Sequence, residues 1–357
     1  MLTEEQIKEI KEHLDRAQNP VFFFDNDPDG LCSFLLLRRY LGRGKGVVIK
    51  SFPDLNEGYF RKVEEFNADY IFILDKPVVS AGFFNKTREV NIPVVWIDHH
   101  EVQEGVPDFV HYFNPNYNGG SVTGTNNNNN NNNNGEPVTS FCWNATKRKE
   151  DMWISIIGCV SDSYLPEFYY GFQEQFQDLT VNAKCAFDVL YKSKLGEVAR
   201  MFSYGLKDKT SNVVTMLKFL IEAKSPYDVL EENSKNKSFH KRYHQLHAKY
   251  LRLLEKAKSF YSDGNKLLFF KYSGDLSISG ELANELVYIY PNKTILVAYV
   301  NGERVSLSLR GKGIREKFLE AIGGLEGSSG GGHKDAVGGV LQHKNLEAFV
   351  ERLRDLS

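Results

Sequence analysis

An apolar run that ends in three closely spaced carboxylates constrains this chain more than any other stretch. Residues 21–24 are apolar and have the length of a buried strand, and Asp25, Asp27 and Asp29 follow at alternating positions. Carboxylates this close repel one another, and a stable fold tolerates them when cations neutralise their charge. The segment therefore predicts a metal site. The alternative interpretation is an acidic turn, because asparagine, proline and glycine alternate with the aspartates.

Three further apolar runs also end in carboxylates or imidazoles. Residues 70–74 precede Asp75, residues 93–97 precede Asp98, His99 and His100, and residues 156–161 precede Asp162. The carboxyl ends of parallel strands meet at one edge of a sheet, where open α/β folds bind ligands, so we expect these side chains to converge there. Carboxylates mixed with imidazoles suit Mn²⁺ or Mg²⁺ better than zinc.

Strands and helices alternate through the first part of the chain. We expect strands at 21–25, 47–49, 70–75 and 93–98, and helices at 4–17, 30–42, 57–67, 80–89, 137–145 and 152–163. Such alternation over short connections predicts an α/β fold with a parallel, doubly wound sheet. After His100 the pattern lapses, and no further strand is predicted until residue 267.

Length and composition set broader limits. A chain of 357 residues exceeds what one hydrophobic core usually supports, so we expect two domains. The formal net charge of −2 excludes a uniformly basic nucleic-acid binder. The four cysteines have no C-x-x-C spacing, the first residues lack a signal-peptide pattern, and no apolar run has the length of a membrane span. We therefore expect a cytoplasmic protein with no membrane partner.

Nine consecutive asparagines, Asn126 to Asn134, separate two of these regions. A homopolymer of this kind buries nothing, which predicts a disordered surface loop, native or artefactual. Because it falls between two candidate ligand segments, the alternative is a lid over the site.

The motifs together resemble the DHH phosphoesterases. Asp25 to Gly30, Asp75, Asp98-His99-His100 and Ser161-Asp162 are similar to the four motifs of that family. Gly330-Gly331-Gly332-His333, preceded by Arg310, resembles the signature of the DHH-associated substrate-binding domain. The resemblance covers roughly residues 18–165 and 266–350. It implies a catalytic DHH domain at 1–165, a helical connector at 166–262 and a smaller α/β domain at 263–357.

The resemblance also implies roles for the first-domain residues. Two Mn²⁺ ions, or Mg²⁺ in their place, would be held by Asp27, Asp29, Asp75, His99 and Asp162, with Asp75 between them. Relatives that act on small substrates often carry histidine where this chain has Phe23, so Asp25 would supply the missing ligand, as in the RecJ-type exonuclease branch. His100 would contact the scissile phosphate or protonate the leaving group, and Asp98 would orient an imidazole.

In the second domain the resemblance makes Arg310 and His333 the residues that hold a substrate phosphate or base, assisted by Ser308. Glycines let backbone amides approach an anion closely, so Gly330, Gly331 and Gly332 would assist as a loop.

The middle of the chain carries no motif but contains one basic segment. Residues 166–262 lack strand signals and predict helices, and residues 235–258 hold eight basic residues against one acidic. Tyr243, Leu246 and Tyr250 recur at helical spacing, so one face should pack while the other is basic. The segment is either a solvated connecting helix or a wall that follows a phosphate backbone and stacks bases.

These observations favour a manganese-dependent exonuclease or oligoribonuclease acting on single-stranded DNA, RNA or short oligonucleotides at a cleft between two domains. A small-nucleotide phosphatase or cyclic-dinucleotide phosphodiesterase would use the same metals. An inactive replication scaffold should have lost ligand carboxylates, and all are present here. A replication or repair protein as partner follows from the same resemblance.

Overall fold

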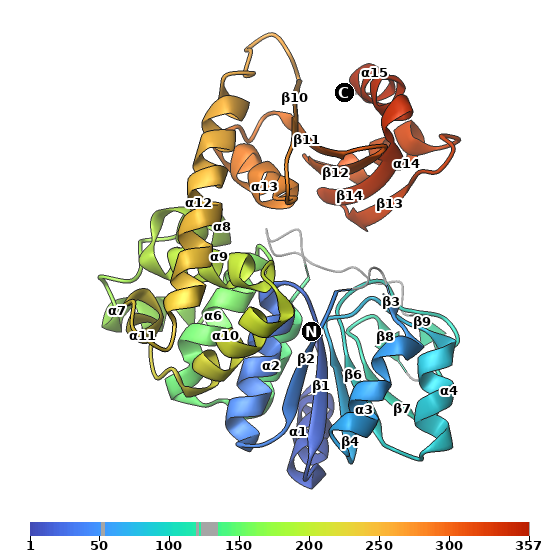
Figure 1. Cartoon of the computed structure of the whole chain (residues 1–357), viewed down its shortest axis with the longest axis vertical. Helices are drawn as coiled ribbons and strands as arrows, with labels where there is room; N and C mark the ends of the chain where they lie inside the picture. The colour runs from blue at the N-terminus through green and yellow to red at the C-terminus, as the bar shows by residue number, and fades with distance from the viewer. Residues whose placement is uncertain (51–53, 119–120, 123–134, 357) are drawn as a thin grey trace. The chain divides into compact units, whose positions relative to one another are not determined.

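The computed structural model describes residues 1–50, 54–118, 121–122 and 135–356. These residues form two compact units, Met1–Tyr243 and His244–Ser357 (Figure 1). The predicted domain limits at residues 165 and 262 stay a prediction. The asparagine run, with its two interpretations as a surface loop or a lid, lies outside the described residues. Within the described residues, no helix combines the length and the apolar character that crossing a membrane would require.

The first unit is built on a five-stranded parallel sheet. Its strands run in the order β2 (Lys45–Ile49), β1 (Pro20–Asp25), β4 (Tyr70–Leu74), β6 (Val94–Ile97) and β7 (Val110–Phe113). This order confirms the predicted doubly wound fold, and the chain changes direction across the sheet between β1 and β4. The edge strand β7 was not predicted. Two short pairings, β3 (Asp54–Leu55) with β5 (Val78–Val79) and β8 (Tyr117–Asn118) with β9 (Ser121–Val122), lie outside this sheet.

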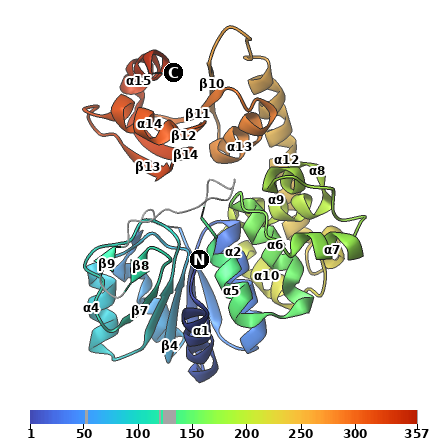
Figure 2. The ribbon, with the colours of Figure 1, turned by 180° about the vertical axis from the view of Figure 1, so that it is seen from behind.

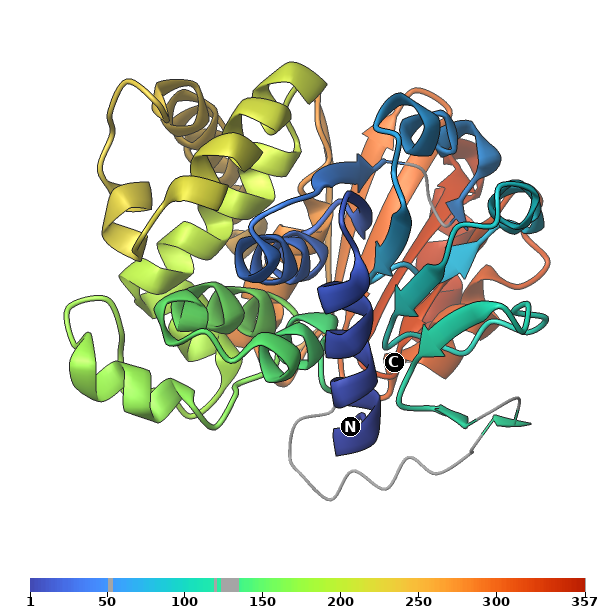
Figure 3. The same cartoon turned by 90° about the horizontal axis from the view of Figure 1, so that it is seen from below.

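Helices cover both faces of this sheet, which explains why its three central strands are almost wholly apolar. On one face, Phe23, Ile73 and Trp96 pack in a core with residues of η1 (Glu57–Tyr59), α3 (Arg61–Glu65) and α4 (Ala81–Glu89). On the other face, Phe22 and Phe24 contact Phe34 of α2 (Pro28–Leu41). Helix α1 (Glu4–Arg16) lies on this second face beside α5 (Val138–Thr146), as the views in Figures 2 and 3 show.

Helix α2 begins at Pro28, two residues before the predicted start. The Asp27 carboxylate caps it by accepting a hydrogen bond of 2.9 Å from the Gly30 amide, and proline suits the first turn because it has no amide hydrogen to satisfy. A Cβ on Gly30 would lie 2.7 Å from both the backbone nitrogen and oxygen of Asp25. Glycine therefore lets the helix start directly against the end of β1.

The rest of the first unit is helical, as predicted for this part of the chain. A buried ion pair joins Arg39 of α2 to Asp151, and Arg39 also donates to carbonyls at the end of α10 (Thr210–Glu222), so these segments are held together. The helices are α6 (Met152–Ser161), preceded by η2 (Lys149–Asp151), then α7 (Tyr169–Gln175), α8 (Ala186–Lys192), α9 (Lys194–Leu206), α10 (Thr210–Glu222) and α11 (Pro226–Leu230).

Helix α12 (Lys237–Lys258) contains the boundary between the two units. Tyr243, Leu246 and Tyr250 are buried, which confirms the predicted packed face. Because both tyrosines are buried, their rings are not available to stack on bases. The stacking part of the nucleic-acid interpretation of this helix therefore has no support.

The second unit contains a smaller mixed sheet in the order β10 (Leu267–Ser273), β11 (Thr294–Asn301), β12 (Arg304–Arg310), β14 (Ala336–Gln342) and β13 (Ser329–His333). Only β10 and β11 pair in parallel. Core residues on one face pack with α14 (Ile314–Ile322) and α15 (Leu346–Asp355), the latter preceded by η3 (His343–Asn345), while α13 (Ser279–Ile289) contacts β11 and β12. This confirms the predicted smaller α/β domain. The predicted glycine loop is wrong in one respect, because Gly330–Gly332 belong to the edge strand β13.

Candidate metal centre and substrate site

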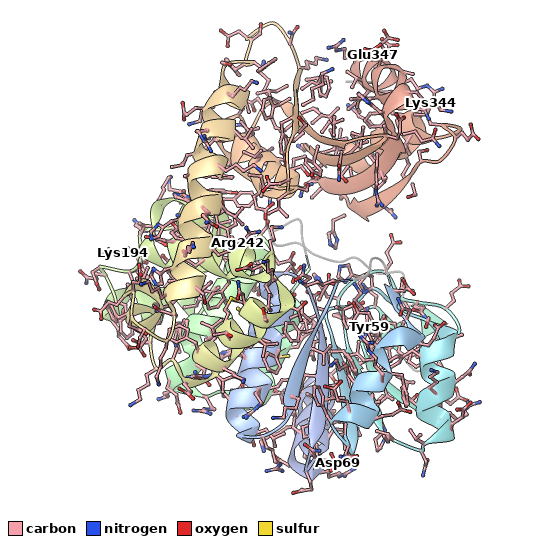
Figure 4. All side chains as sticks on the ribbon, in the orientation of Figure 1. Tyr59, Asp69, Lys194, Arg242, Lys344 and Glu347 are labelled. Atoms are coloured by element: carbon pink, nitrogen blue, oxygen red, sulfur yellow. The ribbon has the colours of Figure 1, made fainter. Side chains whose placement is uncertain are left out.

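The predicted ligands of the first unit gather at the carboxyl edge of its sheet. Asp69 precedes β4 and marks the amino ends of the strands, whereas Tyr59, whose hydroxyl accepts a hydrogen bond from the amide after β2, marks the opposite edge (Figure 4). The chain leaves β1 in one direction and returns to β4 on its other side, so this edge contains the switch point where doubly wound sheets bind ligands.

Asp29 is fixed by two helices at once. It lies in the first turn of α2, is 2 % exposed, and its two carboxylate oxygens accept hydrogen bonds of 3.0 and 2.8 Å from the Val138 and Thr139 amides at the start of α5. The Thr139 hydroxyl donates to the Asp29 carbonyl. Each carboxylate oxygen has a second lone pair, so Asp29 is oriented by α5 and can still bind a cation.

His99 lies between Asp75 and Asp162. Its Nε2 is 3.4 Å from Oδ1 of Asp75, and its Nδ1 is 3.8 Å from Oδ2 of Asp162. Asp29, His99 and Asp162 each offer a ligand atom within 4.8 Å of the other two. Asp75 directly follows β4 and has a φ of 58°. Asp162 directly follows α6, and the next residue, Ser163, has a φ of 63°. Left-handed backbone at non-glycine residues is uncommon and concentrates at functional sites.

The centre fits a divalent cation. Oδ1 of Asp75 and Oδ2 of Asp162 are buried and have no hydrogen-bond partner among the described residues. Burial and the neighbouring carboxylates raise the pKa of Asp27 to about 7 and that of Asp162 to about 8, and they raise the pKa of Asp75 well above its usual value. Burial and the adjacent His100 lower the pKa of His99, which keeps its imidazole neutral and able to bind a metal.

His100 belongs to a hydrogen-bonded group beside this centre, and its Nδ1 lies 3.8 Å from Oδ1 of Asp75. Its Nδ1 is 2.8 Å from Oδ1 of Asp98, and its amide donates to Oδ2 of the same carboxylate. The Asn114 side-chain amide donates to Asp98, to the His100 carbonyl and to the Tyr112 hydroxyl. Burial lowers the pKa of His100, but the Asp98 carboxylate more than offsets this and raises it to about 9. His100 is therefore a proton donor at neutral pH.

Asp25 has a cation beside it. Nζ of Lys76 lies 2.8 Å from Oδ1 of Asp25, and the Lys76 side chain is 1 % exposed. The Lys76 carbonyl accepts a hydrogen bond of 3.0 Å from the indole nitrogen of Trp96. Lys76 was not predicted as a site residue, because a single lysine after a strand is usually a solvated surface residue.

Four of the predicted substrate-binding residues, Ser308, Arg310, Gly331 and His333, share one face of the second unit's sheet, whereas Gly330 and Gly332 lie on the other face. Strand pairing places Arg310, Ala336 and His333 in one row, and Ser308, Gly338 and Gly331 in the next row of the same face. The Arg310 guanidinium donates to the Asn284 side chain at 2.5 Å and to two backbone carbonyls, and the Ser308 hydroxyl donates to that of Ser279.

The three glycines of β13 differ in how much space surrounds them. A Cβ on Gly330 would meet the Gly338 carbonyl and the Phe318 ring at 2.6 and 2.7 Å, and Gly332 has a φ of 140° with the Ala336 carbonyl 2.5 Å from its would-be Cβ. A Cβ on Gly331 meets nothing within 4 Å. Packing and backbone geometry thus require glycine at 330 and 332, whereas Gly331 leaves an open surface between Ser308 and His333.

Two family models match the chain in the regions that contain these groups. Residues 21–142 match the model of the DHH family, N-terminal domain, and residues 264–356 match that of the DHHA1 domain. Together the matches span more than half of the sequence. The chain belongs to the DHH family.

Solved structures agree with this family assignment at the level of the fold. RecJ from Thermus thermophilus in complex with Mn²⁺ matches with a TM-score of 0.66 and 14 % identity over 99 % of this chain and 54 % of that one. A structure of exonuclease RecJ bound to manganese matches with a TM-score of 0.61 and 14 % identity, covering 100 % of this chain and 94 % of that one. CDC45 from Entamoeba histolytica matches with a TM-score of 0.51 and 11 % identity, covering 98 % of each chain. The fold of this DHH-family chain is RecJ-like.

The chain spans about half the length of the Thermus thermophilus RecJ that it matches. None of the curated proteins matches its sequence.

Several side chains around the predicted residues were missed from the sequence. Lys76, Thr139 and Asn114 in the first unit, and Ser279 and Asn284 in the second, orient or neutralise predicted site residues. Lys76 directly follows Asp75 in the sequence, but its contact with Asp25, 51 residues away, also depends on tertiary packing. The other four lie in segments whose proximity to the site depends on tertiary packing.

Proposed function

We propose that this DHH-family chain is a Mn²⁺-dependent phosphodiesterase that trims single-stranded nucleic acid or short oligonucleotides, with Mg²⁺ as an alternative ion. The observation that carries the proposal is the pair of unpartnered, buried carboxylate oxygens of Asp75 and Asp162 on either side of His99. Buried carboxylates without donors are stabilised by a cation. The family assignment supports phosphoester hydrolysis as the reaction.

The proposed roles follow from the surroundings of each residue. Asp27, Asp29, Asp75, His99 and Asp162 hold the metal. When bound, a divalent ion polarises a phosphoryl oxygen and lowers the pKa of a bound water. The resemblance predicts two ions that share Asp75. A second ion requires that Asp25 is free to act as a ligand.

His100 acts as the general acid in this proposal. Its imidazole is protonated at neutral pH because Asp98 accepts a hydrogen bond from Nδ1 and stabilises the positive charge. Nε2 then carries the proton that the leaving oxygen needs as the phosphodiester bond breaks. Asn114 holds both Asp98 and the backbone of His100, and so fixes the ring orientation.

The second unit contributes substrate binding in this proposal. Arg310 and His333, in one row of the sheet, offer donors for a phosphate that does not react, and the open surface at Gly331 leaves room for a nucleoside.

A time course with Mn²⁺ tests the proposal. Single strands of two to about thirty nucleotides, DNA and RNA, are labelled at either end in turn, a length range that separates short-substrate enzymes from processive ones. Release of single nucleotides from longer strands supports the exonuclease and reveals its direction. Cleavage of dinucleotides alone would replace it with a short-substrate phosphodiesterase, and no hydrolysis of any substrate would refute both.

Asp75→Asn provides the control for contaminating nucleases. Asparagine preserves the shape of the side chain but removes the charge that holds the metal, so the variant should lose hydrolysis while remaining folded. Activity that persists in purified Asp75→Asn would show that the observed cleavage does not come from this centre.

A further inference from the structure

The carboxylate cluster of the first unit has two sides that differ in charge compensation. On one side, Asp25 is paired with the Lys76 ammonium at 2.8 Å. On the other side, the oxygens of Asp75 and Asp162 without a hydrogen-bond donor lie 3.4 and 3.8 Å from the two ring nitrogens of His99. The nearest cationic group there is His100, whose Nδ1 lies 3.8 Å from Oδ1 of Asp75 but only 2.8 Å from Asp98, its own counter-ion. The need for an added cation is therefore concentrated on the His99 side.

Lys76 is built into the fold and does not reach solvent. Its side chain is 1 % exposed, its carbonyl accepts a hydrogen bond from Trp96, and it directly follows the left-handed residue Asp75 at the end of β4. Lysine is almost never fully buried without a charged partner. Because it is buried, Lys76 has no path to a substrate, and its effect on the reaction passes through Asp25 and the neighbouring carboxylates.

We propose that Lys76 is a fixed cation that takes the place of one of the two metal ions predicted for this centre. Asp25 is then the counter-ion of Lys76 and not a metal ligand. The centre holds a single tightly bound divalent cation on the side of Asp29, Asp75, His99 and Asp162. This inference rests on the proposed function only in assigning the cluster to metal binding.

Electrostatics favours this arrangement. A second divalent ion ligated by Asp25 would lie within a few ångströms of the Lys76 ammonium, and like charges repel strongly where water is excluded. Without a second ion, Lys76 is the cation that offsets the Asp25 carboxylate, whose side chain is 23 % exposed. Lys76 is thus a positioning residue, since it fixes Asp25 and sets the number of ions that the cluster accepts.

Counting bound manganese tests the inference directly. The full chain is stripped of metal with EDTA and titrated with Mn²⁺, and bound ions are counted by electron paramagnetic resonance and by elemental analysis. We expect one tight ion per chain with the six-line spectrum of an isolated Mn²⁺. Two tight ions with an exchange-coupled spectrum, which ions about 3.5–4 Å apart produce, would overturn the inference. Absence of any tight ion would overturn it as well.

Two variants separate a ligand from a counter-ion. Asp25→Asn should keep the single ion if Asp25 only pairs with Lys76, whereas loss of an ion from this folded variant would contradict the inference. If the lone Lys76 charge prevents Asp25→Asn from folding, the double variant Asp25→Asn/Lys76→Met removes both members of the pair at nearly constant volume and should also bind one ion. Asp162→Asn is the positive control, because it should lose tight binding.

These readouts do not depend on catalysis. One tight ion without hydrolysis of any phosphodiester would refute the proposed function and leave the inference intact. Hydrolysis by a protein that holds two coupled ions would refute the inference and leave the proposed function intact.

Discussion

Nδ1 of His100 lies 2.8 Å from Oδ1 of Asp98, a carboxylate that is completely buried and also braced by Asn114. This contact keeps His100 protonated, with a pKa of about 9, although burial of the ring acts in the opposite direction. The pair places a charged imidazole beside a group of carboxylates that carry the metal-binding role in our proposal.

Asp98→Asn should remove the proton from His100 near neutral pH. Without the carboxylate, burial dominates, so the pKa of His100 should fall to its usual value or lower. The acid form is then lost at a lower pH, and kcat at pH 8 should fall by about 10²–10⁴, the usual contribution of a general acid. NMR titration of His100 in the metal-free protein and the pH dependence of kcat check this. An unchanged His100 pKa would remove Asp98 from this role.

Gly30→Ala should destabilise the first unit by about 1–3 kcal/mol, the usual range for overpacking. The new Cβ would lie 2.7 Å from the backbone of Asp25, so either α2 or the end of β1 must shift. The same shift moves Asp27 and Asp29, and metal affinity should fall with stability. Urea unfolding and Mn²⁺ titration measure the two effects.

Gly171→Ala is the matched control for that experiment. Gly171 also lies in a helix, α7, but its would-be Cβ has no atom within 4 Å. Alanine there should stabilise the protein by about 0.5–1 kcal/mol, because glycine loses more backbone freedom in a helix. If both variants behaved alike, the close approach of α2 to β1 would not be what requires Gly30.

Gly331→Ala should weaken substrate binding without weakening the fold. Its methyl group would enter the open surface on the face that carries Ser308, Arg310 and His333. KM should therefore rise about tenfold, which corresponds to a loss of ~1.4 kcal/mol in the free energy of substrate binding. Gly330→Ala is the comparison, since its Cβ would meet Phe318 on the opposite face and lower the thermal midpoint. An unchanged KM in Gly331→Ala would place the substrate elsewhere.

The parallel sheet and its acidic edge were predictable because both leave local signals. Runs such as residues 70–74 are apolar throughout, and the carboxylates follow where these runs stop, so their order alone indicates a shared edge. Strand β7 was missed because only four residues pair at the edge of the sheet and His111 interrupts their apolar character. The glycines of β13 resemble a loop in sequence, yet pairing with β14 and packing on Phe318 make them a strand.

Charge compensation inside the site was not predictable. Lysine follows Asp75 in the sequence, but nothing local indicates that its side chain turns inward to Asp25, which is 51 residues away. Asp29 likewise gives no local sign that α5, more than a hundred residues later, supplies its two amide donors. Such contacts are set by tertiary packing and decide how many cations the carboxylates still require.

Metal removal should make stability depend on pH in an unusual direction. Asp27 and Asp162 have folded-state pKa values of about 7 and about 8, above the usual value of 3.8, because burial and mutual repulsion disfavour their charged forms. The folded protein therefore binds more protons than the unfolded chain between these limits, and the free energy of unfolding should fall as pH rises from about 4 to about 8. Bound Mn²⁺ neutralises the carboxylates and should remove most of this decline.

Thermal unfolding from pH 5 to 8, in EDTA and in Mn²⁺, measures both stability curves. In EDTA, the stability of Asp162→Asn should decline less steeply with pH than that of the wild-type protein. Parallel curves with and without metal would mean that these carboxylates do not form the metal centre.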